Sequence, residues 1–146
     1  MRVVVQRVKE ASVISDGVLT GKIGKGLMVL FAVHKEDTKA SCKWMAQKLA
    51  NLRLFSDEAG KMNLSVRDVG GEILVVSQFT LYASCLRGRR PDFVGSAPGD
   101  VAEEFYDEFV DRVSDEMGDV QTGKFGAMME VSLVNDGPVT FIIDHP

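Results

Sequence analysis

The sequence predicts a single α/β domain of the mixed, α+β-like kind, with largely antiparallel or mixed sheets and two main helices packed on one side. Three observations support this prediction. Strand-like apolar runs occupy both ends of the 146-residue chain, only two segments repeat apolar residues at helical spacing, and short turns join several strand pairs. A chain of this length can bury about 68–70% of its unfolded surface, enough for one hydrophobic core. Without repeats or linkers, residues 1–146 are expected to form one domain.

The first third of the chain is expected to consist of strands. Residues 3–5 and 13–14 have strand composition, and Ser15-Asp16-Gly17 predicts a hairpin turn into residues 18–20. After glycines at positions 24 and 26, residues 27–33 form a continuous apolar run. Such a run is typical of a central strand that is buried on both faces.

The first helix is predicted over residues 38–52. Its apolar residues recur at three- and four-residue steps, which places them on one face: Cys42, Met45, Ala46, Leu49 and Leu52. A surface turn is expected at residues 57–60, where Asp, Glu, Ala and Gly follow one another. Residues 73–77 then predict a second buried strand.

The second helix is predicted over residues 100–117, after a loop at 87–99 that is rich in Gly, Pro and Arg. One row of this helix is apolar: Val101, Phe105, Phe109, Val113 and Met117. Asp100 and Glu103 have the spacing of a capping box, and Gly118 follows where a C-terminal glycine ends a helix.

The final third again has strand character. Residues 128–134 and 139–143 predict two strands, and Asn135-Asp136-Gly137-Pro138 between them predicts a hairpin turn. On the sequence alone a trans Gly137–Pro138 bond is favoured, because only about 5–6% of X-Pro bonds in folded proteins are cis.

Charge is distributed unevenly along the chain. The net charge is −4, but residues 100–119 hold 9 of the 21 acidic residues and 1 of the 17 basic ones. This leaves 16 basic against 12 acidic residues elsewhere, with Arg87, Arg89 and Arg90 close together. A nucleic-acid partner is therefore permitted, because phosphate contacts need only local positive potential. The alternative is that these arginines form a solvated surface loop that binds no ligand.

Several classes of protein are disfavoured. No stretch approaches the roughly 20 apolar residues of a membrane span, and no signal peptide begins the chain, so we expect a cytoplasmic protein without a membrane partner. Cys42 and Cys85 match no metal-ligand spacing and are expected to be reduced thiols. We expect neither a metal nor another cofactor.

The catalytic candidates lie where the strand at residues 73–77 ends. His34 and His145 are the only imidazoles, one at a strand end and one at a chain end expected to fray, and neither accompanies a nucleophile motif. Ser77, Gln78 and Thr80 offer hydroxyl and amide groups beside free backbone N–H donors. Such donors can form an oxyanion hole for ester hydrolysis. Alternatively, the hydroxyls only form hydrogen bonds with unpaired backbone groups at the end of the strand.

Two segments carry a family resemblance: Ser77-Gln78-Phe79-Thr80-Leu81-Tyr82 and Asn135-Asp136-Gly137-Pro138-Val139-Thr140. Together they resemble the signature motifs of the D-aminoacyl-tRNA deacylases, enzymes that remove D-amino acids from mischarged tRNA. The likeness extends over the chain, through residues 1–8, Gly88-Arg89-Arg90-Pro91 and Thr122-Gly123-Lys124-Phe125-Gly126-Ala127. The segment at 83–87 departs from the family pattern.

The resemblance implies roles for particular residues. Backbone amides around Phe79 would form the oxyanion hole, the 2′-hydroxyl of the terminal adenosine would help to activate water, and Ser77, Gln78 and Thr80 would shape the site. A nucleophilic Thr80 is the alternative, although a threonine without a base is weakly reactive.

The same resemblance implies a homodimer. The Gly137–Pro138 bond would be cis and would enter the partner subunit's active site, where its backbone blocks an L side chain. Arg7, Phe125, Ala127 and Met129 would line the adenosine pocket, although Phe125 also suits a core position.

We therefore expect a D-aminoacyl-tRNA deacylase, a carboxylic ester hydrolase that also accepts glycyl-tRNA because glycine has no side chain to clash. Two alternatives remain: a hydrolase of free D-amino acid esters, and a non-catalytic module that binds a nucleotide end.

Overall fold

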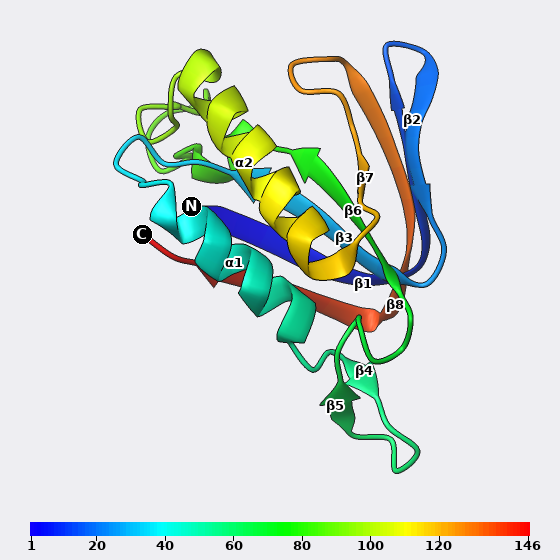
Figure 1. Ribbon diagram of the computed structural model, residues 1–146. Helices are drawn as coiled ribbons and strands as arrows, with labels where there is room; N and C mark the ends of the chain where they lie inside the picture. Colours follow the sequence, from blue (N-terminus) through cyan, green and yellow to red (C-terminus); the bar gives the residue numbers. More distant parts are fainter.

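A six-stranded mixed sheet carries both long helices on one face in the computed structural model, which describes residues 1–146 (Figure 1). A separate two-stranded hairpin projects from one end of the molecule. The elements are β1 (Arg2–Ser15), β2 (Val18–Ile23), β3 (Gly26–Ala32), α1 (Ala40–Asn51), β4 (Phe55–Ser56), β5 (Met62–Leu64), β6 (Glu72–Ser77), the short 3₁₀ helix η1 (Phe79–Tyr82), α2 (Gly99–Met117), β7 (Gln121–Thr122) and β8 (Met129–Asp144).

β1 is the strand on which the sheet is organised. Its residues 2–8 pair antiparallel with β3 and its residues 11–15 pair antiparallel with β2, while β8 runs antiparallel along residues 2–15. β3 and β6 are parallel, as are β6 and β7. The predicted mixed, largely antiparallel sheet with two helices on one side is confirmed.

Both faces of the central strands are buried. Alternate side chains, among them Val5, Val29 and Val75, face the helices, and side chains of the other parity, among them Met28 and Leu74, form a second cluster on the opposite face. Since successive side chains of a strand point to opposite faces, burial on both sides explains the unbroken apolar runs in β3 and β6.

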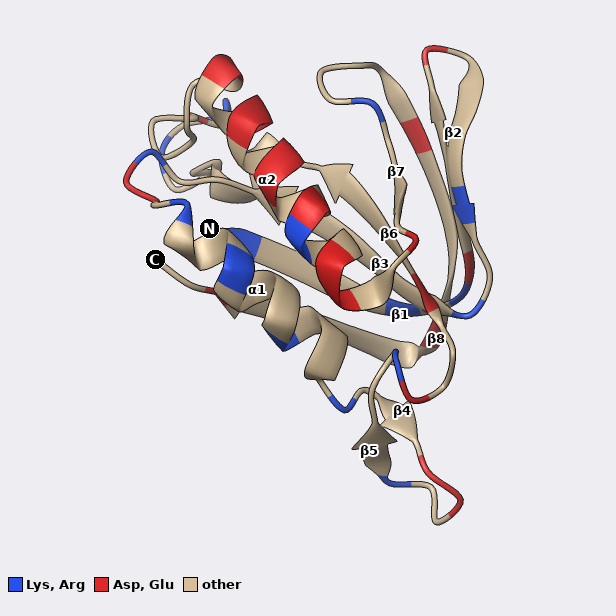
Figure 2. Cartoon of the chain, viewed as in Figure 1, with Lys and Arg blue, Asp and Glu red and all other residues tan.

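The two helices pack on this sheet through the predicted apolar rows. From α1 the buried residues include Met45 and Leu49, and from α2 they include Phe109, whose ring stacks on Phe31 of β3 at 4.4 Å. The acidic residues of α2 lie on its outward side (Figure 2). Neither helix has the length and hydropathy of a membrane span.

The ends of α2 match the predictions only in part. Gly118 ends the helix with a φ of +85°, as expected. The predicted capping box is absent, because the helix begins one residue earlier than expected, at Gly99, and no side chain caps it. Asp100 therefore lies inside the first turn, where its charge still favours the positive end of the helix dipole.

The hairpin predicted between residues 134 and 139 is also wrong. Residues 129–144 form one strand, β8, and both halves pair with β1. Gln6 is opposite Thr140 and Val8 is opposite Asn135, so two steps along β1 correspond to five along β8. The Asn135-Asp136-Gly137-Pro138 segment therefore bulges out of the ladder and does not reverse the chain.

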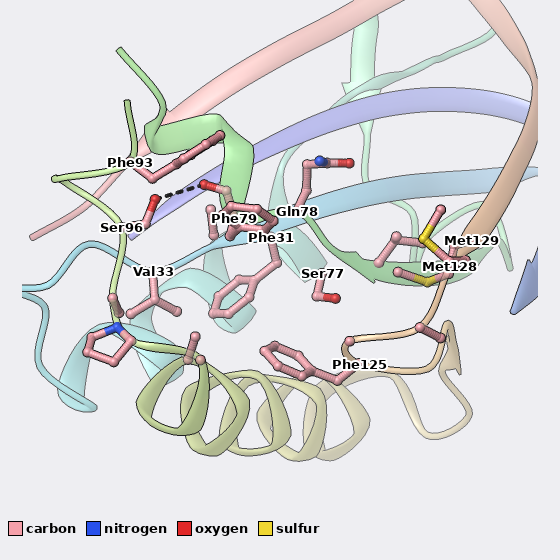
Figure 3. A pocket seen from close by; sticks show the side chains of 18 of the residues that line it. Phe31, Val33, Ser77, Gln78, Phe79, Phe93, Ser96, Phe125, Met128 and Met129 are labelled. Carbon is pink, nitrogen blue, oxygen red and sulfur yellow. Dashed lines mark hydrogen bonds between the residues drawn. The ribbon is translucent and has the colours of Figure 1, made fainter. Parts of the chain in front are cut away.

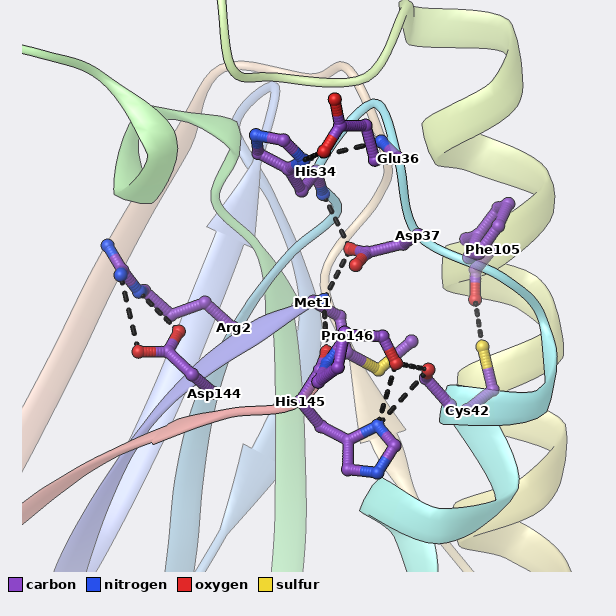
Figure 4. Close-up of polar contacts among 11 residues, drawn as sticks. Met1, Arg2, His34, Glu36, Asp37, Cys42, Phe105, Asp144, His145 and Pro146 are labelled. Carbon is purple, nitrogen blue, oxygen red and sulfur yellow. Dashed lines mark hydrogen bonds and ion pairs between the residues drawn. The ribbon is translucent and has the colours of Figure 1, made fainter.

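The two chain ends are tied together beside α1 (Figure 4). The amino group of Met1 forms a buried ion pair with Asp37 and donates a hydrogen bond to the carbonyl of His145. The His145 ring stacks on Trp44 at 4.1 Å and contacts the Ser41 hydroxyl, so His145 is held in place where fraying was expected. Burial among these elements raises the pKa of the Cys42 thiol to about 11.

Gly26→Ala is expected to lower the free energy of unfolding by at least about 3 kcal/mol, because the new Cβ would lie 1.9 Å from the backbone oxygen of Glu72 on β6. Gly24→Ala is the matched control: its Cβ would meet only the Glu72 side chain, at 3.7 Å. Urea denaturation of both variants measures the difference. Equal midpoints would contradict the close packing of β3 on β6.

Candidate active site

The carboxyl ends of β3 and β6 open into a pocket with a volume of about 800 Å³ (Figure 3). Its walls come from these strand ends, from the segment before α2, from the first turns of α2 and from the chain between β7 and β8. The lining includes Phe31, Val33, Ser77, Gln78, Phe79, Phe93, Ser96, Ala97, Phe125, Ala127, Met128 and Met129. This volume suits a small molecule or one end of a larger one.

The pocket lining is mostly apolar and carries no ionisable side chain. Of its 19 residues, 13 are hydrophobic, and none is Asp, Glu, His, Lys, Arg, Cys or Tyr. The only polar side chains are those of Ser77, Gln78 and Ser96. Chemistry in this pocket must therefore use backbone groups, hydroxyls, an amide or a group that the ligand brings.

Three of the four predicted catalytic residues line the pocket, and they do so because β6 ends here. Ser77 is the last β6 residue paired with β3, and the N–H of Gln78 donates to the carbonyl of Phe31 at 2.7 Å. The chain then turns into η1, which begins at Phe79. The first N–H groups of a helix have no intrahelical acceptor, so donors are available at Phe79 and Thr80.

Thr80 does not line the pocket and is exposed. Its hydroxyl accepts a hydrogen bond from the side-chain amide of Gln78. An amide cannot remove a proton at neutral pH, and no His, Asp, Glu or Lys bonds to this hydroxyl. The geometry therefore provides Thr80 with no general base.

The segment at residues 93–98 forms a wall that sequence reasoning missed. The Ser96 hydroxyl donates to the carbonyl of Phe79 at 3.1 Å, and the N–H of Ala97 donates to the carbonyl of Val33 at 3.0 Å. These bonds hold the segment across the ends of β3 and η1. It has no helical or strand period, so only the aromatic Phe93 could have drawn attention to it.

Phe125, Ala127 and Met129, three of the four residues expected to line the adenosine pocket, line this pocket together. The Phe125 ring is half-buried and lies 5.7 Å from that of Tyr106, so it serves both the core and the pocket. Tyr106 donates its O–H to the carbonyl of Val75 at 2.9 Å, and burial raises its pKa. A Cβ on Gly123 would lie 2.6 Å from the Met129 sulfur, so a larger residue here would displace the Met129 side chain.

The other predicted binding residues, Arg7, Gly137 and Pro138, form a second cluster outside this pocket. The Arg7 guanidinium donates to the carbonyls of Leu54 at 2.7 Å and Asp136 at 3.2 Å, and pairs with the Asp136 carboxylate at 3.4 Å. The Gly137–Pro138 peptide bond is cis, against the expectation from the turn alone. Gly137 has a φ of +134°.

One chain does not bring the two clusters together. Arg7 is paired with Leu27 near the start of β3, whereas the pocket begins at Phe31, four residues further along. Four strand residues span roughly 13 Å. Gly137 and Pro138 are exposed on the bulge beside Arg7, so they are free to contact another molecule.

A model of the family described as D-Tyr-tRNA(Tyr) deacylase matches residues 4–144. The chain belongs to this family. Relatives named D-aminoacyl-tRNA deacylase include that of Desulfatibacillum aliphaticivorans, 58% identical over 145 residues that cover 99% of both chains. The relative from Chlorobaculum parvum is 56% identical over 147 residues, covering 100% of this chain and 99% of the relative. The resemblance predicted from the two motifs is thus confirmed.

Solved structures agree on the fold. One described as the c-Myc DNA Unwinding Element Binding Protein has a TM-score of 0.93 and 44% identity, covering 100% of this chain and 99% of that chain. Another, described as a probable eukaryotic D-amino acid tRNA deacylase, has a TM-score of 0.88 over 99% of this chain and 98% of that chain. At 19% identity the second supports the fold alone.

Proposed function

We propose that this deacylase hydrolyses the ester bond between a D-amino acid, or glycine, and the 3′ end of tRNA, as a proofreading step of translation in the cytoplasm. The observation that carries the proposal is the apolar pocket at the ends of β3 and β6. It lacks every ionisable side chain, and it is part of a chain that is more than half identical to relatives named D-aminoacyl-tRNA deacylase.

The ester bond itself makes a pocket of this composition sufficient. An aminoacyl ester is already activated, so the enzyme can act by positioning the bond and stabilising the oxyanion. The N–H groups of Phe79 and Thr80 at the start of η1 supply the donors, each typically worth about 2.7–4 kcal/mol in the transition state. The 2′-hydroxyl of the terminal adenosine then helps to activate water, which replaces the base that the pocket lacks.

The terminal adenosine is held on the wall formed by Phe125, Ala127 and Met129. An aromatic ring such as Phe125 offers a stacking surface, and stacking of a base on an aromatic side chain is worth about 1–3 kcal/mol. Ser77 and Gln78, at the end of β6, orient the ester toward the N–H donors of η1.

Chiral selection is assigned to the Gly137–Pro138 bulge of a second subunit in a homodimer. Within one chain, Arg7 beside the bulge is opposite Leu27, roughly 13 Å along β3 from Phe31 at the pocket, which supports a role of the bulge in the partner's pocket. Arg7 supports this interpretation, because its hydrogen bond and ion pair to Asp136 hold the base of the bulge. A backbone wall excludes an L side chain whatever its chemistry.

A non-catalytic module that binds a nucleotide end is the alternative. It is favoured by one relative with a solved structure, 44% identical to this chain, which is described as a DNA-binding protein. The absence of ionisable groups from the pocket is compatible with binding as well as with hydrolysis. A hydrolase of free D-amino acid esters is the third candidate, and it would need no tRNA.

The purified protein is expected to deacylate D-Tyr-tRNA and to leave L-Tyr-tRNA intact, with a metal chelator present throughout. Release of labelled tyrosine measures both reactions. A D-tyrosine methyl ester assayed in parallel tests the free-ester hydrolase. Binding of both tRNAs without turnover would instead support the binding module.

Thr80→Ala is expected to keep kcat on D-Tyr-tRNA within about threefold of the wild type, because the Thr80 hydroxyl has no base and lies outside the pocket lining. Thr38→Ala, an exposed threonine outside both motifs, is the control. Loss of turnover by Thr80→Ala with unchanged binding of D-Tyr-tRNA would make Thr80 the nucleophile.

Gly137→Val is expected to reduce D-Tyr-tRNA binding and to weaken rejection of L-Tyr-tRNA. Its Cβ would lie 2.6 Å from a methyl of Val139 and 3.2 Å from an Arg7 nitrogen, at a φ that L residues rarely adopt. Gly60→Val is the matched control, since Gly60 also has a positive φ but open space around it. A folded Gly137→Val variant with wild-type kinetics and selectivity would remove the bulge from the mechanism.

A further inference from the structure

An exposed loop beside the pocket carries three arginines. We define the arginine loop as residues 85–91, which contains Arg87, Arg89 and Arg90. Its base is closed by two backbone hydrogen bonds between Ser84 and Asp92, at 2.9 and 3.0 Å. All seven residues of the loop are exposed, so the three positive charges stand in solvent on a segment that is fixed at both ends.

The three arginines are the only ones in the chain without a partner. Four of the other five donate a hydrogen bond to a side chain: Arg2 to Asp144, Arg53 to Asn63, Arg67 to Glu116 and Arg112 to Glu108. The fifth, Arg7, forms an ion pair with Asp136. No hydrogen bond or ion pair involves the guanidinium of Arg87, Arg89 or Arg90. Their charge is therefore available to an anionic ligand.

The loop continues directly into the pocket wall. Phe93, which lines the pocket, follows Arg90 by three residues and Arg87 by six. A chain extends at most about 3.5 Å per residue, so the Cα atoms of Arg90 and Arg87 lie within roughly 11 and 21 Å of that of Phe93. A ligand whose end occupies the pocket and whose anionic body extends outward passes within reach of this loop.

Acidic residues limit the directions from which such a ligand can approach. α2 begins at the pocket, and its acidic residues lie on its outward side (Figure 2). Asp100, Glu103 and Asp107 in its first turns are exposed, and Asp92 pairs with Ser84 at the base of the loop. A polyanion is repelled from the α2 side and attracted to the arginine loop.

We propose that the arginine loop binds the backbone phosphates next to the terminal adenosine, at the single-stranded 3′ end and acceptor stem of the substrate tRNA. This inference rests on the proposed function, which places the adenosine in the pocket. Guanidinium groups suit the task because they bind phosphate oxygens with two parallel hydrogen bonds. The loop contributes to the affinity for tRNA, and the chemistry proceeds in the pocket without it.

The test is the triple variant Arg87→Gln, Arg89→Gln, Arg90→Gln, assayed on D-Tyr-tRNA and on the 3′-D-tyrosyl ester of adenosine. On the tRNA substrate KM is expected to rise at least about tenfold, with kcat unchanged. The slope of log(kcat/KM) against log salt should flatten by about 2, since each phosphate contact to a single strand contributes roughly 0.7. The adenosine ester, which has no phosphate, should be hydrolysed as by the wild type.

A second triple variant, Lys22→Gln, Lys43→Gln, Lys61→Gln, is the matched control. It removes the same charge from exposed lysines whose side chains form no ion pair, on β2, α1 and the β4–β5 turn. Its KM for tRNA is expected to stay within about twofold of the wild type. An equal rise of KM in both triples would reduce the effect to net charge and overturn the inference.

Fluorescence anisotropy with uncharged tRNA separates this inference from the proposed function. If the wild type binds tRNA and the arginine triple binds about tenfold more weakly, the loop is the phosphate site even when no ester is cleaved. If the arginine triple keeps the wild-type affinity and salt dependence, the inference is wrong, whatever the enzyme hydrolyses.

Discussion

Hydrogen bonding along both edges of β1 fixes the positions of the pocket and of the Gly137–Pro138 bulge. One edge pairs with β3 and then β2, and the other edge pairs with β8 along residues 2–15. β3 in turn aligns β6 in parallel, so their carboxyl ends lie together and the pocket forms there. Between the pairs Gln6–Thr140 and Val8–Asn135, β8 has more residues than β1. The unpaired residues of β8 protrude as the Gly137–Pro138 bulge beside Arg7. Both clusters of family residues thus derive their positions from one strand.

The composition of the pocket explains how a hydrolase can function without a catalytic side chain of the usual kind. Its lining offers two hydroxyls and an amide, and no side chain that titrates, and in the proposed mechanism the N–H groups at the start of η1 serve as the donors. Such a site can only act on a bond that is already activated, and an aminoacyl ester is one. Backbone donors are fixed by the fold, so they need no reorganisation as charge develops in the transition state. In the proposed mechanism the substrate's own hydroxyl supplies the remaining function.

Charge and shape recognise different parts of the tRNA in the proposed complex. The apolar pocket is suited to the nucleoside and the amino acid, whose contacts are short-ranged, whereas the arginine loop acts on the phosphates over a longer distance. The net charge of −4 does not oppose this arrangement, because nine of the acidic residues belong to residues 100–119, which include α2. α2 therefore serves two purposes: its apolar face completes the core, and its acidic face leaves the arginine side as the favourable approach for a polyanion.

The class of fold, both helices, the strand at 73–77 and the family could all be predicted from the amino-acid sequence, because apolar periodicity and short motifs are local properties of the chain. The sequence also indicated Ser77, Gln78 and Phe79 as site residues, because they lie at the end of a strand that its apolar run predicts. That residues 129–144 are one strand follows from long-range pairing, since a turn and a bulge have the same Gly-Pro composition and differ in which strand pairs with each half. The tertiary structure also brought Phe93 and Ser96 to the pocket wall, which required hydrogen bonds to residues distant in sequence. Long-range pairing of this kind leaves no period in the sequence, so no local pattern could have predicted it.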